Sequence, residues 1–278
     1  MEAGEIALAE FAPDHLDGAL ALSRQAGWPH RRQDWEMVLA LSAGLVALEQ
    51  GRVVGAALFT PYGRDAAMIN MVIVDQAMRG RGVGRALMER ALQNGEGREC
   101  RLIATSEGLP LYEKLGFSAT HAVVQHQGAA APTLRPQGVE PASRDDMDAI
   151  AALDRVACGV DRRALFALLA ETARFVVLRR RDEVAGFAAL RNFGRGDVIG
   201  PVVAGHGEDA KALISFFLAE RPGAFVRVDT PTAGDLASWL AGRGLLHVGG
   251  GVAMRRGGKP PYASSEMRTF ALASQALG

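Results

Sequence analysis

The clearest chemical signal in the sequence is a short alternation of arginine and glycine. The segment Arg79–Gly84 reads RGRGVG, follows the apolar run MVIV, and opens a helix-forming stretch that contains Arg85. The first N–H groups of a helix have no partner within it and lie at the positive end of the helix dipole. Glycines let those amides approach an anion, and the arginines add charge, so the segment predicts a cradle for a pyrophosphate.

The spacing of the glycines separates this cradle from two common nucleotide loops. A Walker loop needs Gly-Lys-Ser/Thr, which does not follow here, and a dinucleotide fingerprint needs G-x-G-x-x-G. In this chain Gly80, Gly82 and Gly84 stand two apart. The pattern alone therefore leaves a second interpretation open, a tight strand-to-helix turn that binds nothing.

A second motif follows the next predicted strand, and the order of the two motifs is informative. The order is strand, RGRGVG, helix, strand and then LYEKLGF, and it resembles the GNAT superfamily of N-acetyltransferases. The family's acyl-CoA motif, Arg/Gln-x-x-Gly-x-Gly/Ala, is matched by Arg79, Gly82 and Gly84. Its Leu-Tyr-x-x-x-Gly-Phe motif is matched by Leu111, Tyr112, Gly116 and Phe117.

The resemblance implies acetyl-CoA as co-substrate, no metal, and a set of coenzyme-binding residues. The pantetheine arm is expected beside the main chain of Val72, Ile73 and Val74. The pyrophosphate is expected on the segment formed by Arg79, Gly80, Arg81, Gly82, Val83, Gly84 and Arg85. Backbone N–H groups of the fourth strand are expected to stabilise the oxyanion. Tyr112 is expected near the thioester sulfur as the general acid that protonates the leaving thiolate; the alternative is a packed core tyrosine.

The general base stays open at this stage. Many family members carry an asparagine seven residues before the tyrosine; here the position is Thr105, which can order water or coenzyme amides but cannot act as a base. Glu107 is a weak candidate for the base. The other candidates are Asp75, His121, His126 and a chain of water molecules. The two histidines stand at odd separation in one strand and therefore face opposite sides.

The acceptor pocket in this family is usually shaped by the connection between the first two helices. That connection reads AGWPHRRQDW here, and it predicts Trp28, His30 and Arg31 as substrate contacts, with Trp28 exposed and Trp35 in the core.

The chain repeats itself at an offset of 131 positions, as from Pro13 to Arg144 and from Gly55 to Gly186. A constant offset over this distance predicts a tandem duplication. The predicted organisation is a coenzyme-binding domain over residues 1–128, a linker over 129–137 and a second domain over 138–278. The expected fold is α/β (α+β), with a mixed, mostly antiparallel sheet flanked by helices in each domain. In the first copy we expect helices over 13–27 and 31–42 and strands over 44–49, 53–60 and from 67.

The second copy lacks the chemical parts of the first. GHGED replaces the arginine–glycine cradle, and Leu240 takes the place of Tyr112. Glu208 and Asp209 then stand where a phosphate would meet amides, which is repulsive for a phosphate. We therefore predict a degenerate GNAT-like domain with a structural or substrate-selecting role, in which Asp229, Asp235, His247 and Arg268 could line a shared pocket.

Bulk composition limits the partners. Formal net charge is zero, from 31 basic and 31 acidic residues, so neither nucleic acid nor a membrane surface is expected as a partner. The N-terminus carries acids rather than the apolar core of a signal peptide, and Cys100 and Cys158 stand far apart, so a reducing, cytoplasmic location is expected. The chain is expected as a monomer with pseudo-dimeric domains or as a homodimer.

Together these features predict an acetyl-CoA-dependent N-acetyltransferase that acts directly on a small-molecule primary amine. One alternative keeps the reaction but makes the acceptor a protein N-terminus or lysine. The other is a non-enzymatic acyl-CoA-binding regulatory module.

Overall fold

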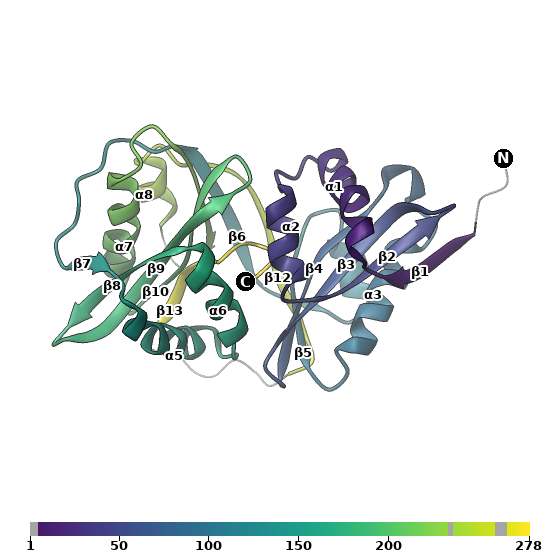
Figure 1. The fold of residues 1–278 in the computed structure, drawn as a ribbon, viewed down its shortest axis with the longest axis horizontal. Helices are drawn as coiled ribbons and strands as arrows, with labels where there is room; N and C mark the ends of the chain where they lie inside the picture. The colour runs from purple at the N-terminus through teal and green to yellow at the C-terminus, as the bar shows by residue number, and fades with distance from the viewer. Residues whose placement is uncertain (1–4, 233–235, 259–265) are drawn as a thin grey trace.

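The computed structural model describes residues 5–232, 236–258 and 266–278, which form two lobes side by side (Figure 1). The N-terminal half of the chain builds one lobe and the C-terminal half builds the other. The last residue lies between the two lobes, close to the middle of the molecule.

The first lobe has the predicted order of elements, with boundaries within a few residues of those expected. Its strands are β1 (Ile6–Glu10), β2 (Ala43–Glu49), β3 (Arg52–Tyr62), β4 (Ala66–Val74), β5 (Glu99–Ala104) and β6 (Ser118–Ala129). Its helices are α1 (Leu16–Gln25), α2 (Arg32–Leu39), α3 (Val83–Asn94) and α4 (Leu109–Lys114), with short 3-10 turns η1 (Pro13–His15) and η2 (Gln76–Met78).

The second lobe repeats this order, as the constant offset predicted. Its strands are β7 (Val139–Pro141), β8 (Arg174–Arg180), β9 (Glu183–Phe193), β10 (Gly196–Ala204), β11 (Phe225–Pro231), β12 (Leu246–Arg256) and β13 (Arg268–Ala271). Its helices are α5 (Met147–Cys158), α6 (Arg163–Thr172), α7 (Gly207–Ala219) and α8 (Ala237–Ala241), and η3 (Arg144–Asp146) precedes α5.

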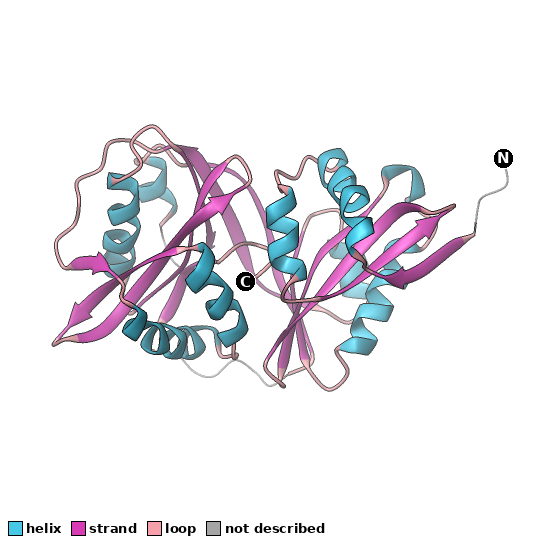
Figure 2. Cartoon of the chain, in the orientation of Figure 1, coloured by secondary structure: helices cyan, strands magenta, loops and turns pink. Residues whose placement is uncertain are grey.

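The two lobes exchange strands and share one sheet, which the sequence did not predict. The strand order is β1-β2-β3-β4-β5-β12-β6-β11-β10-β9-β8-β7, with β13 beside β10. Strand β6, expected to close the first half's own sheet, therefore reaches β11 of the second half, while β12 of the second half pairs with β5 of the first. Figure 2 shows these strands crossing between the lobes.

The pairing of β6 with β12 is symmetric about its own centre. Leu246 pairs with Gln127 at one end and Arg255 pairs with Ser118 at the other. Two copies of one strand that run antiparallel in this way are related by a local two-fold axis, so each half lends its sixth strand to the other. The exchange satisfies backbone hydrogen bonds that a separate half would leave open at a sheet edge.

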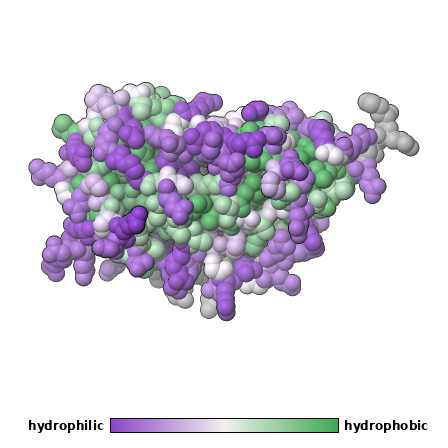
Figure 3. Space-filling model, in the orientation of Figure 1, coloured by the Kyte–Doolittle hydropathy of each residue, from purple (hydrophilic) through white to green (hydrophobic). Residues whose placement is uncertain are grey.

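The main apolar core also spans both lobes. One cluster of buried side chains contains residues of α1 and α2, of α5 and α6, and of the strands beneath them, together with Ala273 and Leu277 from the end of the chain. On the opposite face of the sheet, α3 and α4 cover the first half and α7 covers the second, each over a separate cluster. Hydrophilic residues cover most of the face in Figure 3, with apolar residues showing between them.

The described residues contain no helix long and apolar enough to cross a membrane. The two cysteines are unpaired: Cys100 is buried and Cys158 is half-buried.

Candidate active site

The first half contains an open strand edge, meaning a stretch of β4 that its neighbour β5 leaves unpaired. Strand β4 pairs in parallel with β5 only at its start, where the last pair joins Met68 to Arg101. On its other side β4 stays paired with β3 up to Val74. Between these points the edge from Ile69 to Val74 has no pair in β5, so its backbone groups are available to an extended ligand. This stretch includes Val72, Ile73 and Val74, the residues expected beside a pantetheine arm.

The cradle lies directly beyond this edge. Gly80 has φ of 78° and Gly82 has φ of 79°, and a Cβ placed at either residue would meet no atom within 4 Å. Gly82 caps α3, and the first helical hydrogen bond runs from Ala86 N–H to the Gly82 carbonyl at 3.0 Å. The amides of Val83, Gly84 and Arg85 therefore precede the first bond of the helix and have no acceptor within it. The left-handed glycines and the open space fit an anion.

The three arginines of the cradle are held by acids. Arg79 pairs with Glu107 at 2.9 Å, Arg81 with Glu49 at 2.8 Å, and Arg85 with Glu89 at 2.8 Å. The sequence suggested that these side chains add charge directly to the cradle. In the structure each arginine is at least partly neutralised by its carboxylate, so the amides of the loop supply the local dipole.

Tyr112 sits in the first turns of α4 and packs against the α3 face of the sheet. It is 7% exposed and belongs to the apolar cluster that contains Leu87 and Met88 of α3. The ring of Phe117 meets it edge-on at 6.1 Å. Burial raises the pKa of Tyr112 to about 12, so its hydroxyl is protonated at neutral pH and can donate a proton.

None of the side chains considered as a base stands free beside the open edge. Glu107 is exposed and paired with Arg79. Thr105, which was not a candidate for the base, is exposed, and its Oγ1 accepts from the Gly108 amide at 3.3 Å in the turn before α4. Asp75 accepts hydrogen bonds from Arg52 and from the amide of Ala77, and the bond from Arg52 lowers its pKa. Asp75 therefore remains a structural carboxylate.

The two histidines of β6 face opposite sides, as their odd separation predicted. His121 is exposed and its Nδ1 lies 3.1 Å from Thr120 Oγ1. His126 is 1% exposed and lies between β11 and β12, where it pairs with Val228 and His247. The strand exchange carries His126 away from β4 and toward the second half.

The loop expected to shape the acceptor pocket packs against the second half. The His30 ring lies 5.4 Å from the Phe193 ring, and Asp34, held by Arg31 at 2.8 Å, accepts from the amide of Gly194 at 3.0 Å. Trp28 was expected to be exposed, but it is half-buried because it packs against the apolar core that both lobes share. Trp35 is fully buried, as expected, and donates to Ser23 Oγ at 3.0 Å.

The second half has filled its corresponding edge with its own chain. Strand β10 pairs with β11 only at Asp197 and Val198, and β13 then pairs with β10 from Val202 to Ala204. The open stretch of β4 therefore has a covered counterpart in β10. Strand β10 ends at Ala204 and α7 begins at Gly207, which leaves no room for a phosphate loop.

The other residues of the second half that were considered for a site make structural contacts or are exposed. Leu240, in the place of Tyr112, is fully buried, and Asp209 at the start of α7 pairs with Arg180 at 2.9 Å. Asp229 is buried and held by Arg227 at 2.9 Å, whereas His247 is exposed. Arg268 lies over the Phe270 ring at 5.1 Å. Asp235 lies outside the described residues.

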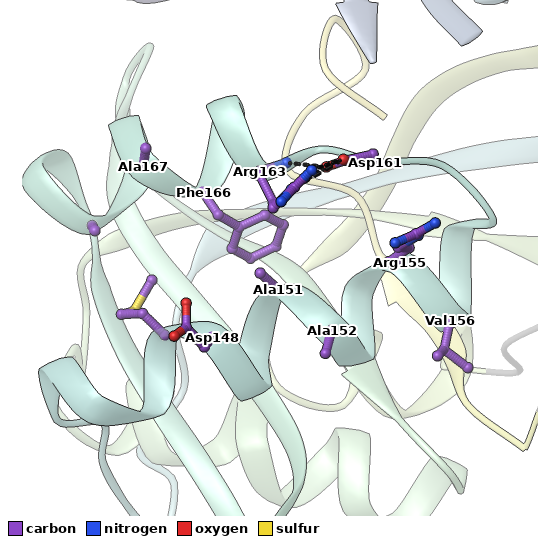
Figure 4. Close-up of a pocket in the computed structure, with 11 residues that line it drawn as sticks. Asp148, Ala151, Ala152, Arg155, Val156, Asp161, Arg163, Phe166 and Ala167 are labelled. Atoms are coloured by element: carbon purple, nitrogen blue, oxygen red, sulfur yellow. Dashed lines mark hydrogen bonds and ion pairs between the residues drawn. The ribbon is translucent and has the colours of Figure 1, made fainter. Parts of the chain in front are cut away.

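A groove of about 710 Å³ lies on the second half, between α5 and α6 (Figure 4). Phe166 projects into it, and the exposed ion pair of Arg163 with Asp161 lies at its rim. It is lined only by residues of the second half and is separate from the edge of β4. Among the described residues no three His, Cys, Asp or Glu side chains are grouped to hold a metal ion.

Comparison with known proteins gives the family. Two family models, each described as an acetyltransferase (GNAT) domain, match the chain, one over residues 41–119 and the other over residues 150–269. The matches fall in both halves and together cover more than half of the chain. The chain belongs to the GNAT family. It is a tandem GNAT protein, because each half carries its own match.

Relatives and solved structures agree with this assignment. The chain is 29% identical over 234 residues to the uncharacterized N-acetyltransferase YitH of Bacillus subtilis (strain 168), a match over 81% of this chain and 82% of that protein. The fold is that of a putative acetyltransferase from Pyrococcus horikoshii, with a TM-score of 0.84 at 21% identity over 100% of this chain and 98% of that one. A tandem GNAT protein from the clavulanic acid biosynthesis pathway also matches, with a TM-score of 0.62 at 17% identity over 92% and 100%.

Three neighbouring polar residues, one in the turn after α2 and two on strands β3 and β4, were not predicted from the sequence. Ser42, Thr60 and Asn70 lie in contact under the end of α2, and Asn70 stands on β4 beside the open edge. The signal was present, since an asparagine interrupts the apolar run MINMVIV. A polar side chain inside a buried strand needs partners, and the sequence alone did not say which.

Proposed function

We propose that this tandem GNAT protein transfers an acetyl group from acetyl-CoA directly to a primary amine of a small molecule. The observation that carries the proposal is the open edge of β4, which leaves β5 after Met68 and leads directly into the cradle at Gly80 and Gly82. An extended arm with a diphosphate at one end fits an edge and a cradle placed in this order.

The residues of the first half have distinct tasks in this proposal. The backbone of Val72, Ile73 and Val74 pairs with the pantetheine arm. The amides of Val83, Gly84 and Arg85, which have no acceptor within α3, bind the pyrophosphate. Bound acetyl-CoA supplies the activated acetyl thioester. A backbone N–H of β4 stabilises the oxyanion that forms when the amine attacks the carbonyl carbon.

The acetyl transfer changes two bonds at the carbonyl carbon and needs two proton transfers. A bond forms between the amine nitrogen and the carbonyl carbon, and the bond between that carbon and sulfur breaks. Tyr112 gives its proton to the leaving thiolate and regains one from solvent, while the amine loses its proton to water. Solvent takes this proton because Glu107 and Asp75 are committed to arginines.

We also propose that each chain binds one acetyl-CoA. Strand β13 covers the edge of β10, and the phosphate loop is missing between Ala204 and Gly207. Leu240 stands in the place of Tyr112, the proposed general acid. The second half then serves the first by donating β12 to its sheet and by covering the loop at Trp28 and His30. A covered loop favours a small acceptor over a protein segment.

Amino sugars are reasonable first acceptors to test. A glucosamine 6-phosphate N-acetyltransferase of Trypanosoma brucei brucei is 37% identical over 78 residues, which are 25% of this chain and 53% of that protein.

Calorimetric titration with acetyl-CoA, followed by a transfer assay, tests the proposal. We expect one site per chain and release of free CoA thiol with at least one amine among glucosamine, glucosamine 6-phosphate, spermidine and lysine amide. Two sites would contradict the assignment of the second half. Binding without transfer to these amines, but with transfer to a peptide N-terminus, would favour a protein acceptor. Binding without any transfer would favour a regulatory module, and the absence of binding would contradict the coenzyme assignment.

A further inference from the structure

Asn70 carries a buried hydrogen-bond acceptor with no partner. The residue is 5% exposed, and its Oδ1 contacts no donor within the described part of the chain. Leaving such an atom unpaired costs about 1–3 kcal/mol, so folding alone does not favour it. An unpaired acceptor at this place is explained if a ligand supplies the donor.

A chain of hydrogen bonds fixes which atom of the Asn70 amide is the free one. Ser42 Oγ donates to the Val38 carbonyl at 2.6 Å, so its only proton is used. Thr60 Oγ1 lies 2.6 Å from Ser42 Oγ and must therefore donate to it. Thr60 Oγ1 can then only accept from Asn70, whose Nδ2 lies 2.8 Å away. The amide nitrogen is held in this chain, and the oxygen is left free.

Asn70 stands at the point of β4 where the proposed acetyl group would lie. It is two residues past the last pair with β5 and immediately before Met71, whose φ of 50° marks a bulge in β4. From Val74 to Asn70 the strand spans about 13 Å, four residues at about 3.3 Å each. An arm that starts at the cradle and follows the edge therefore ends close to Asn70.

The Asn70 side chain and Tyr112 lie on opposite faces of the sheet. The partners of Asn70 link it to the end of α2, whereas Tyr112 packs in the cluster of α3. The open edge of β4 lies between the two faces. This arrangement puts an acceptor of N–H groups on one side of the edge and a donor of protons on the other.

The second half keeps the strands but has lost this chain of hydrogen bonds. At the offset of 131, Ser42 and Thr60 correspond to Ala173 and Arg191. The offset falls to 130 in β10, since Phe59 pairs with Ile69 and Leu190 with Ile199, so Asn70 corresponds to Gly200. All three polar groups are replaced in the half whose edge is covered by β13. The corresponding strands of the second half form without this chain of hydrogen bonds, so the fold does not require it.

We propose that Asn70 Oδ1 accepts a hydrogen bond from the neutral primary amine and orients the amine lone pair toward the thioester carbon. This rests on the proposed acetyl transfer and adds the residue that binds the nucleophile. A neutral amide oxygen accepts from a neutral amine without raising the pKa of the amine as a carboxylate would. The amide oxygen therefore offers an N–H acceptor without adding a negative charge to the site. Asn70 neither gains nor loses a proton in the step, and the amine proton leaves to water.

Two variants of Asn70 and one matched control test this proposal in the full chain, with the best amine of the panel above as probe. Asn70→Leu removes the acceptor at similar size, and we expect kcat/KM for the amine to fall about 10–100-fold while the Kd of acetyl-CoA stays unchanged. Asn192→Leu makes the same change at an exposed asparagine that donates to Asp197, and it should leave both quantities unchanged.

Asn70→Asp keeps the shape and provides a readout that a purely structural role would not move. A carboxylate would hold the protonated amine, so the rise of kcat/KM with pH should shift to higher pH than in the wild type. Wild-type kcat/KM in Asn70→Leu, or an unshifted profile in Asn70→Asp, would overturn the role of Asn70 while leaving acetyl transfer in place. If the wild type itself fails to acetylate any amine, acetyl transfer to small amines is overturned, and the role of Asn70 with it.

Discussion

Arg79 and Glu107, 28 positions apart, form an ion pair of 2.9 Å that joins the cradle to the turn before α4. Both side chains are more than half exposed, so the pair contributes little to stability. The pair nevertheless argues against Glu107 as the general base, because its carboxylate is exposed and already bonded to an arginine.

Glu107→Gln should therefore change turnover by less than about twofold, with the same dependence on pH. A general base would contribute about 10²–10⁴-fold, so the two roles are well separated. Steady-state rates over a range of pH check this. A loss of a hundredfold or more, with the ascending limb of the profile removed, would return Glu107 to the role of base.

Tyr112→Phe should lower kcat at least tenfold while the Kd of acetyl-CoA stays within about twofold, because the ring remains and only the proton donor is lost. Burial raises the pKa of Tyr112 to about 12, so the phenol stays protonated well above pH 9. Wild-type kcat should consequently show no fall on the alkaline side up to pH 10. Unchanged kcat in Tyr112→Phe would leave Tyr112 as a core residue only.

The glycines of the cradle should differ sharply in their tolerance of alanine. Gly82 has φ of 79°, so alanine there costs about 1–2 kcal/mol of backbone strain even though the space is open. At Gly84 a Cβ would make ordinary contacts of 3.5 Å with Leu111 and Val74. We expect Gly82→Ala to weaken acetyl-CoA binding about 5–30-fold, the factor that this strain corresponds to, and Gly84→Ala to bind nearly as the wild type does, both by calorimetry. Equal losses would show that the conformation at Gly82 is not what the cradle needs.

Elements within each half could be predicted from the sequence because their signals are local. The strands around Gln50 and Gly51, the helix that begins after Gly82 and the repeat offset all depend on turn residues and periodicity. The absence of a cradle in the second half could also be predicted, because the corresponding segment is deleted from the sequence. The structure adds that β13 covers the exposed edge of β10.

The exchange of β6 and β12 could not be predicted, because the pattern of a strand does not identify its neighbour. The alternation of apolar and polar residues is the same whether a half is closed by its own last strand or by that of the other half, because the same faces of the sheet are buried in both cases. In the structure His126 consequently lies between β11 and β12, in the part of the sheet where the two halves meet. The ion pair of Glu107 with Arg79 could not be predicted either, because an ion pair between exposed side chains leaves no pattern in the sequence.

The His30 ring should make the protein less stable in acid. Burial lowers the pKa of His30 to about 4, with Arg227 and Arg191 adding to the effect. Between pH 6.5 and pH 4 the unfolded chain binds a proton that the folded chain does not, so stability rises with pH across this window. On acidification from pH 6.5 to pH 5 the expected loss is about 2 kcal/mol at most, at about 1.4 kcal/mol per pH unit. Urea unfolding of His30→Phe should lack this part of the slope, and an unchanged slope would contradict the assignment.

The buried pair of Asp154 with Arg162 should be the costliest ion pair to break at the junction of the lobes. Its two side chains are 1% and 2% exposed and lie 2.6 Å apart, and Arg162 also donates to the carbonyls of Leu277 and Gly278. Asp154→Ala leaves a buried guanidinium without its carboxylate, which costs about 3–5 kcal/mol. Asp17→Ala breaks an exposed pair with Arg32 and should cost no more than about 1 kcal/mol. Urea midpoints at constant slope compare the two variants, and similar losses would mean that water reaches the buried pair.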